Sequence, residues 1–223
     1  MPGYQVKVET HWLGDSSFEI RSLLDRQQYS DPDGAAHAAG ISSASWPLFG
    51  MVWPSARMLA QAMQSQDLAG KRILEIGCGL ALASLVIHRR CGDITASDRH
   101  PLTGVFLAEN VRLNALPHLK YETGHWGREN LGLGRFDLII ASDVLYERDQ
   151  PDTLSRFIDR HSADVVEVIV LDPDRGNRSG FCRRMQALGY TLDMRRAGAV
   201  QTTGEPYKGH FLNFQRRPVV APA

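Results

Sequence analysis

The sequence contains little cysteine, no long hydrophobic run and no excess charge, and each absence excludes a class of protein. Its three cysteines, Cys78, Cys91 and Cys182, are an odd number without paired spacing, which argues against a disulfide framework or a zinc site. No apolar run reaches the roughly 18 residues that span a bilayer, and the N-terminal MPGYQVKVETHW does not form a secretory signal. We therefore expect a soluble, cytoplasmic protein with reduced thiols and no membrane partner.

The net charge and the histidine spacing argue against nucleic-acid partners and metal sites. The 25 basic and 25 acidic residues cancel, so no overall field attracts nucleic acid, and we expect no nucleic-acid partner. The eight histidines include no H-x-x-x-H pair, so we expect no metal. A chain of 223 residues is long enough for one compact domain with a sizeable core, and we expect a monomer.

From Pro54 onward, apolar runs alternate with helical segments, which is typical of a doubly wound α/β fold with a mostly parallel sheet. The predicted strands are Arg72–Ile76, Asp93–Ser97, Leu119–Thr123, Phe136–Ser142, Asp164–Leu171, Tyr190–Arg195 and His210–Arg216, the last two separated by the turn-rich Thr202–Lys208. The predicted helices are Pro54–Met63, Leu80–Arg90, Pro101–Leu116, Pro151–Ser162 and Arg178–Leu188.

The first 45 residues differ from the rest of the chain. They carry two alternating runs, Tyr4–Trp12 and Phe18–Leu24, followed by a polar segment of small residues from Ser30 to Ser45. We therefore divide the chain into a short N-terminal β appendage, residues 1–45, and one domain, residues 46–223.

The most informative stretch is RILEIGCGLALASL, from Arg72 to Leu85. It predicts a buried strand, a glycine turn and a helix. Gly77 and Gly79 allow the backbone to approach a ligand closely, and the following helix offers unpaired N–H groups. A dinucleotide turn, G-x-G-x-x-G, would place its last glycine where this chain has Leu82. An NAD-dependent oxidoreductase is therefore a distant alternative.

Acidic residues near the turn favour a different cofactor. Glu75 would repel a pyrophosphate but suits the positive end of S-adenosylmethionine (SAM), which carries an amino group and a sulfonium. Asp98 ends the second strand, about 20 residues past the turn, where an adenosine ribose is held through its hydroxyls. Alternatively, Asp98 caps the helix that opens at Pro101. Together the turn and the acids favour an adenosine-containing ligand.

These residues resemble a known family. Glu75-Ile76-Gly77-Cys78-Gly79, Asp98 and Ser142-Asp143-Val144-Leu145-Tyr146 resemble the seven-strand SAM-dependent methyltransferases, and within them methyltransferase family 16, which contains protein-lysine methyltransferases. The family motif after the fourth strand is an acid, any two residues, then Tyr or Phe, which Asp143 and Tyr146 match. Trp53-Pro54 matches the family's tryptophan-proline pair. The resemblance covers roughly residues 49–171 and implies a Rossmann-like, seven-stranded sheet.

The resemblance implies a set of residues that contact SAM and two that act on the acceptor. The cofactor residues are Trp53, Glu75, Gly77, Cys78, Gly79, Asp98, Arg99, His125, Trp126 and Ser142. The catalytic residues are Asp143 and Tyr146, with Asp143 capturing and orienting an incoming amine and Tyr146 acting as a wall and hydrogen-bonding group.

Two positions depart from the family. Ala81 replaces the third glycine. His125 stands where an Asp or Asn usually precedes Trp126, so adenine recognition needs either a neutral ring nitrogen of His125 or a backbone carbonyl. Trp126 itself either stacks on adenine or covers the end of the sheet as a core aromatic.

Several alternatives stay open from the sequence alone. The charged loop Asp172–Arg178 either selects the acceptor or is solvated, and the aromatic stretch Trp46–Trp53 either covers SAM or packs onto the core. We expect a SAM-dependent N-methyltransferase that modifies a lysine of a protein substrate. The alternatives are a small-molecule N-methyltransferase of the nicotinamide type, which would differ in how far residues 1–45 close over the site, and a non-catalytic SAM-binding interaction module.

Overall fold

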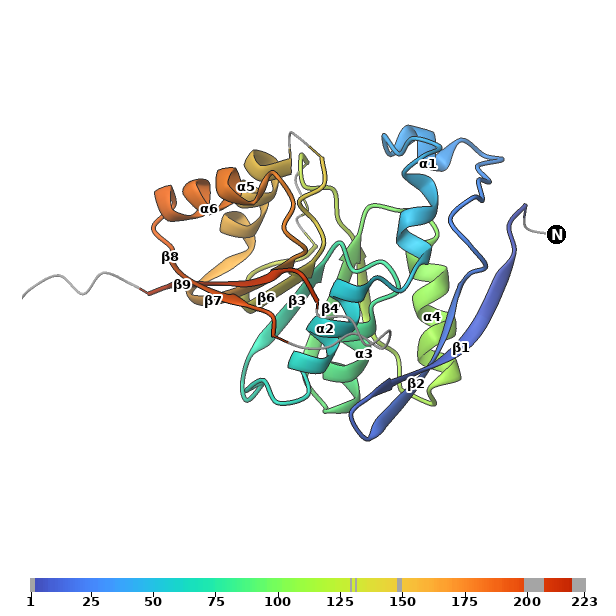
Figure 1. Ribbon diagram of the computed structural model, residues 1–223, viewed down its shortest axis with the longest axis horizontal. Helices are drawn as coiled ribbons and strands as arrows, with labels where there is room; N and C mark the ends of the chain where they lie inside the picture. Colours follow the sequence, from blue (N-terminus) through green and yellow to red (C-terminus); the bar gives the residue numbers. More distant parts are fainter. Residues whose placement is uncertain (1–2, 129, 131, 148–149, 199–206, 218–223) are drawn as a thin grey trace, which may run out of the picture.

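A computed structural model describes residues 3–128, 130, 132–147, 150–198 and 207–217. It contains a seven-stranded sheet with the order β5-β4-β3-β6-β7-β9-β8 and a separate two-stranded hairpin, β1-β2. The pairings β4–β5, β3–β4, β3–β6 and β6–β7 are parallel, while β7–β9 and β8–β9 are antiparallel. The doubly wound, mostly parallel sheet predicted from the sequence is confirmed (Figure 1).

The elements follow one another in an alternating order. The strands are β1 Val6–Leu13, β2 Ser16–Leu23, β3 Arg72–Ile76, β4 Asp93–Asp98, β5 Lys120–Thr123, β6 Phe136–Ser142, β7 Ser162–Asp172, β8 Thr191–Arg196 and β9 His210–Arg216. The helices are α1 Ala35–Ala38, the 3₁₀ helix Trp46–Gly50, α2 Pro54–Ala62, α3 Leu82–Arg89, α4 Thr103–Leu113, α5 Gln150–His161 and α6 Arg178–Ala187.

The sheet separates two hydrophobic layers because successive strand residues point to opposite faces. Ile73 of β3 packs with α2, α3 and α4, whereas its neighbour Leu74 packs with α5 and α6. Leu138 and Ile139 of β6 divide in the same way. Helices α5 and α6 lie beside each other in Figure 1, away from α2, α3 and α4, so both faces of the central strands are covered.

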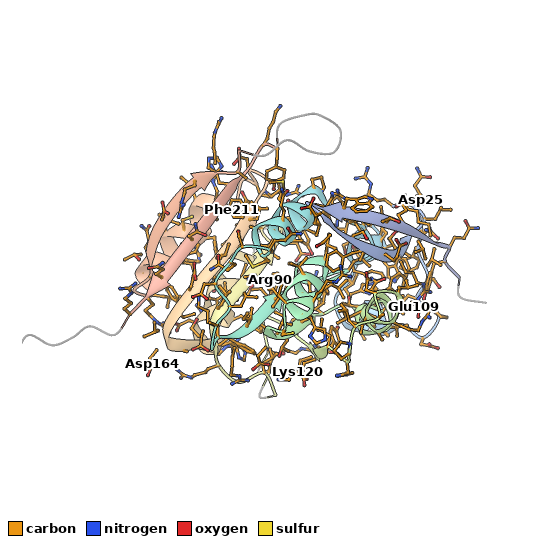
Figure 2. The ribbon with its side chains drawn as sticks, turned by 90° about the horizontal axis from the view of Figure 1, so that it is seen from below. Asp25, Arg90, Glu109, Lys120, Asp164 and Phe211 are labelled. Carbon is orange, nitrogen blue, oxygen red and sulfur yellow. The ribbon has the colours of Figure 1, made fainter. Side chains whose placement is uncertain are left out.

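The hairpin lies against α4, where two asparagines bind its outer edge. The Asn110 Oδ1 atom accepts a hydrogen bond from the Arg21 N–H (2.7 Å), and the Asn114 amide bonds both the N–H and the C=O of Glu19 (3.0 and 2.7 Å). These amides occupy the edge of β2 as a further strand would. Figure 2 shows the hairpin beside the helical layer, with the charged Asp25, Lys120 and Asp164 at the periphery.

Most differences from the sequence prediction lie at element ends. Helix α3 begins at Leu82 rather than Leu80, because Ala81 adopts a left-handed conformation (φ 57°) that ends the glycine turn. The short helices α1 and Trp46–Gly50 fall within segments for which we predicted no helix. Residues 202–206 of the predicted turn Thr202–Lys208 lie outside the described residues.

Two further observations concern the chain as a whole. Cys78, Cys91 and Cys182 are all free thiols. Among the helices that the structure describes, none is long and apolar enough to cross a membrane.

We predict that Asn110→Ala destabilises the protein by about 1–3 kcal/mol, because the substitution leaves backbone groups of Arg21 without their partner at a buried site. Glu109→Ala is the control, since it removes only a surface ion pair with Arg112 and should cost below about 1 kcal/mol. Urea unfolding of both variants measures the difference, and equal effects would contradict the role given to Asn110.

Candidate active site

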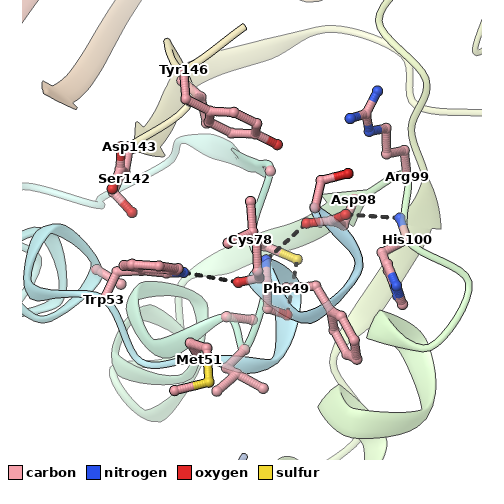
Figure 3. A pocket seen from close by; sticks show the side chains of 18 of the residues that line it. Phe49, Met51, Trp53, Cys78, Asp98, Arg99, His100, Ser142, Asp143 and Tyr146 are labelled. Atoms are coloured by element: carbon pink, nitrogen blue, oxygen red, sulfur yellow. Dashed lines mark hydrogen bonds between the residues drawn. The ribbon is translucent and has the colours of Figure 1, made fainter. Parts of the chain in front are cut away.

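The site lies at the carboxyl ends of the neighbouring strands β4, β3, β6 and β7. These ends meet at one edge because the strands are parallel. A cavity of about 350 Å³ opens there and contains Gly77, Asp98, Asp143 and Arg175 in its wall. A volume of this size falls within the range of small-molecule and cofactor sites. Figure 3 shows side chains from several elements around this cavity.

The glycine turn leaves no room for a side chain at either of its two glycines. Gly77 and Gly79 both adopt positive φ angles, 59° and 52°. A Cβ atom added at Gly77 would lie 2.9 Å from Cγ1 of Val144, and one at Gly79 would lie 3.0 Å from the carbonyl oxygen of Phe49. Glycine is therefore required twice over, for backbone conformation and for close approach. Cys78, between them, also lines the cavity.

Asp98 faces the cavity from the end of β4. Its Oδ2 atom accepts a hydrogen bond from the N–H of Gly79 and its Oδ1 atom accepts one from the N–H of His100, both at 2.9 Å (Figure 3). Burial raises the pKa of this carboxyl group, and the two backbone donors oppose the rise. Both oxygens keep further lone pairs for hydroxyl groups of a ligand.

Glu75 is placed differently from our expectation. It lies under the glycine turn and is almost fully buried, outside the cavity wall. Its Oε2 atom accepts hydrogen bonds from the N–H (2.8 Å) and the hydroxyl of Ser84, in the first turn of α3. Burial raises the pKa of Glu75 to about 7. The structure therefore gives this carboxyl group a place at the start of α3, below the turn that borders the cavity.

Aromatic residues from the segment before α2 form another wall. The indole Nε1 of Trp53 donates a hydrogen bond to the carbonyl of Leu48 (2.8 Å), which fixes the ring. Phe49 stacks on the imidazole of His100, with ring centroids 3.7 Å apart and planes at 13°. Burial lowers the pKa of His100 to about 3, so this ring is neutral. Arg26 of the N-terminal segment lies 5.9 Å from the centroid of the Trp53 ring.

His125 and Trp126 are adjacent in sequence, but only Trp126 lies in the cavity wall. Trp126 lines the cavity and also packs against the core between the sheet and α5, which is the core role considered for it; its stacking on adenine stays a prediction. His125 lies outside the cavity wall, and its Nδ1 atom already accepts a hydrogen bond from the N–H of Gly127 (3.2 Å). Arg99 is at the wall, paired with Glu147 (2.8 Å).

Asp143 and Tyr146, the two predicted catalytic residues, both line the cavity, as does Ser142. Asp143 has a positive φ of 53°, an unusual conformation for a residue other than glycine. Its carboxylate accepts two hydrogen bonds from the guanidinium of Arg175, Nε to Oδ1 at 2.9 Å and Nη2 to Oδ2 at 3.1 Å. Tyr146 is 41% exposed, so the wall it forms continues to the protein surface.

These residues fit SAM. The close backbone at Gly77 and Gly79 leaves space for a ligand, the Asp98 oxygens are positioned to accept from ribose hydroxyls, and aromatic rings border the cavity. Within the described part of the chain, no group of three His, Cys, Asp or Glu residues could hold a metal ion.

Known structures with the same fold include methyltransferases. The fold aligns with the 16S rRNA N2 G1207 methyltransferase (RsmC) of T. thermophilus, solved with AdoMet and guanosine, with a TM-score of 0.63 at 12% identity over 96% of this chain and 51% of that one. It also aligns with the ribosomal protein L11 methylase of Lactobacillus delbrueckii subsp. bulgaricus, with a TM-score of 0.59 at 17% identity over 74% and 79% of the two chains. The protein therefore has the fold of the SAM-dependent methyltransferases.

The relatives that are similar in sequence are methyltransferases that act on proteins. The chain is 29% identical to the calmodulin-lysine N-methyltransferase of Arabidopsis thaliana over 150 residues, which cover 61% of this chain and 49% of the relative. It is 32% identical to the protein N-lysine methyltransferase METTL21A of Danio rerio over 57% and 63% of the two chains. The histone-arginine methyltransferase METTL23 of Homo sapiens is 35% identical over 43% and 54%.

A match to a family sequence profile, which covers more of the chain than some of these relatives do, identifies the family. The sequence profile of the lysine methyltransferase family matches residues 45–186, more than half of the chain, and the protein belongs to this family. Its cofactor is SAM. The matched region spans between about half and two thirds of the length of these curated relatives.

Two residues that line the cavity, Arg175 and His100, are not among the site residues predicted from the sequence. Arg175 belongs to the charged loop Asp172–Arg178, for which the sequence allows two roles, and its place after β7 puts it at the same sheet edge as Asp143. His100 carried no sequence signal beyond its closeness to Asp98. Arg26, Ile41 and Ser45 also line the cavity, so the N-terminal 45 residues contribute to its wall.

We predict that Gly77→Arg abolishes SAM binding, because even the first side-chain carbon would meet Val144 and the rest would fill the cavity. Gly70→Arg is the matched control, since Gly70 also has a positive φ (66°) but no atom within 4 Å of an added Cβ. The midpoint of thermal unfolding, measured with and without SAM, reports binding. A SAM-dependent rise in the Gly77→Arg variant equal to that of wild type would refute the placement of the cofactor.

We predict that wild type loses stability relative to Glu75→Gln as pH rises from about 4.5 to about 7. Folded Glu75 keeps its proton over this window while the unfolded side chain releases it, so deprotonation favours unfolding; above pH 7 the difference is constant. Urea unfolding at pH 5, 6, 7 and 8 measures it. Glu122→Gln, at an exposed position, is the control. A difference between wild type and the Glu75→Gln variant that does not change with pH would disprove the role of burial.

Proposed function

We propose that this protein is a SAM-dependent N-methyltransferase that modifies a lysine side chain of a protein substrate. The observation that carries the proposal is the presence of Asp143 and the glycine turn in the wall of one cavity, with Tyr146 reaching from that wall to the surface. Relatives that are named for lysine methylation of calmodulin and of other proteins support it.

The residues of the cavity wall divide the tasks of binding SAM and excluding water. The chemistry that bound SAM supplies is an electrophilic methyl group on a sulfonium. Gly77, Cys78 and Gly79 border the cofactor, Asp98 accepts from its ribose hydroxyls, and Trp53 and Trp126 exclude water on two sides. Arg99 and Ser142 complete the wall near the cofactor. Glu75 acts from below by fixing the start of α3.

Asp143 and Tyr146 act on the acceptor. The Asp143 carboxylate orients the amine by hydrogen bonds, and the ring of Tyr146 forms the opposite surface and attracts the methylated cation through its face. Alignment of the amine with the methyl group is the main contribution required of the protein, because the displacement itself needs no covalent help.

The proposal extends to the partner and place of action. We propose a protein acceptor that presents its side chain at Tyr146, a monomeric enzyme, action in the cytoplasm, and a domain over residues 46–223 with an appendage over residues 1–45. Adenine recognition falls to backbone groups and Trp126, because His125 lies outside the cavity wall.

One observation favours a second candidate, a small-molecule N-methyltransferase. Arg26, Ile41 and Ser45 of the N-terminal segment line the cavity, so this segment partly covers it. A more complete cover would suit a small acceptor. The exposure of Tyr146, 41%, weighs toward a side chain that enters from a protein surface.

We predict that the protein transfers label from methyl-labelled SAM to a discrete protein band in a host-cell extract, and that Asp143→Ala lowers this transfer at least about 100-fold while SAM still binds, because the acceptor loses its orienting group. Asp193→Ala, on the exposed strand β8, is the control for loss of one carboxylate.

The other results have distinct meanings. Label only in the small-molecule fraction would make the second candidate the function. SAM binding without any transfer would favour a non-catalytic module, and undiminished transfer by the Asp143→Ala variant would remove Asp143 from the mechanism.

A further inference from the structure

The pair formed by Arg175 and Asp143 changes what the acceptor site can bind. Asp143 lines the cavity and its side chain is only 10% exposed, yet both of its oxygens are engaged by one guanidinium. A bidentate pair of this kind is among the stronger hydrogen-bonded contacts of a carboxylate. The acceptor therefore meets a neutral ion pair at this wall instead of a bare negative charge.

The loop that carries Arg175 is fixed at several points. The N–H of Arg175 donates to the Oδ2 atom of Asp172 (2.9 Å). Two residues later, the side-chain amide of Asn177 donates to the carbonyls of Leu145 (3.0 Å) and Glu147 (2.9 Å), which flank Tyr146. The loop after β7 thus holds both acceptor residues from outside, Asp143 through Arg175 and Tyr146 through Asn177.

Other charged and titratable groups near the pair also have contacts of their own. Asp174 contacts Arg178 and His210. Asp172 is fully buried and outside the cavity wall, and the opposite charge of Arg178 acts on it. The hydroxyl of Tyr207 is held by Ser55 at 2.7 Å, and burial raises the pKa of this phenol to about 12, so it stays protonated. Arg26, Asp98 and Arg99 also line the cavity, and Arg175 is the charged residue whose side chain hydrogen-bonds Asp143.

A bare carboxylate poses a difficulty for methylation of lysine. The free side chain has a pKa of about 10.4, and its nitrogen can attack only after the proton has left. A neighbouring carboxylate would favour the ammonium form and raise that pKa. A neutral pair removes this preference, and its hydrogen-bonding edge still orients the amine.

We propose that Arg175 is a specificity-determining residue that makes the acceptor site select an amine in its unprotonated form. This inference rests on the proposed function. The proton leaves to bulk water before the amine binds; its lone pair then forms the new N–C bond while the C–S bond breaks and its electron pair stays on sulfur. A guanidinium acceptor keeps its charge at all relevant pH values and finds no uncompensated carboxylate at this wall to bind it. The site accordingly favours lysine over arginine.

Binding of n-butylamine, a lysine side-chain surrogate, tests the proposal without turnover. The protein is saturated with S-adenosylhomocysteine, and NMR titration gives the affinity at pH 7.5 and 9.5. Because the neutral fraction of such an amine rises about tenfold per pH unit below a pKa near 10.4, the affinity of wild type should rise by about 100-fold. Arg175→Met should bind the ammonium, with an affinity that hardly changes between the two pH values.

Two further variants separate charge from structure. Arg175→Lys retains the positive charge and should keep the pH dependence. Arg178→Met removes a nearby cation, at the first residue of α6, which pairs with Asp174 and not with Asp143, and this variant should behave as wild type. In addition, n-butylguanidine should bind the Arg175→Met variant and not wild type.

The outcomes that overturn the proposal are well defined. They are a wild-type affinity that stays constant or falls with pH, the same rise in Arg175→Met, or no amine binding at either pH. A wild type with the expected pH dependence that labels nothing in a cell extract would refute the proposed function alone. A labelled protein band together with a flat binding profile would refute the role of Arg175 alone.

Discussion

The position of β3 between two parallel neighbours is the constraint on which the site depends. Ile76, its last residue, is in register with Ser97 of β4 and with Ala141 of β6. The residues that follow these positions are the glycine turn, Asp98 and the segment that leads to Asp143. Hydrogen bonds from the N–H of Cys78 to Ser97 and from the N–H of Asp143 to Leu171 continue the alignment past the strand ends. A slip of one residue in either pairing would turn the wrong side chains toward the cavity.

The site also depends on unusual backbone conformations in the segments that follow the strands. Gly77, Gly79, Ala81 and Asp143 all have positive φ angles at the sheet edge, and two of them are not glycine. Such conformations are uncommon for residues with a Cβ and persist where the surroundings impose them. At Asp143 the pair with Arg175 and the bond to Leu171 are such surroundings. The turn at Ala81 ends the loop and sets the start of α3, which Glu75 then fixes through Ser84.

The fold and the glycine turn could be predicted from the sequence, because both depend on local patterns of residues. Apolar runs separated by helical segments predict β3, β4 and β6 within a residue or so, and the glycines and Asp98 stand next to strand ends by sequence alone. The partners of the acids were not predictable. Glu75 bonds Ser84 nine residues away, and Asp143 bonds Arg175 across 32 residues, so both contacts follow from packing and not from spacing. The asparagines that bind the hairpin to α4 lie 89 and 95 residues from their partners and gave no local signal.

Asp98 and Asp143 are both carboxylates in the cavity wall, but their hydrogen-bond partners differ. This difference suits them to different tasks. Asp98 receives hydrogen bonds from backbone N–H groups, which orient it without cancelling its charge. It therefore suits neutral hydroxyl groups that need a strong acceptor. Asp143 receives a full cation, so its charge is compensated before an acceptor arrives. Had the cation been placed at Asp98 instead, the acceptor side would hold an ammonium too firmly for it to lose its proton. In the proposed mechanism, the distribution of Arg175 and backbone donors at one sheet edge separates cofactor binding from acceptor selection.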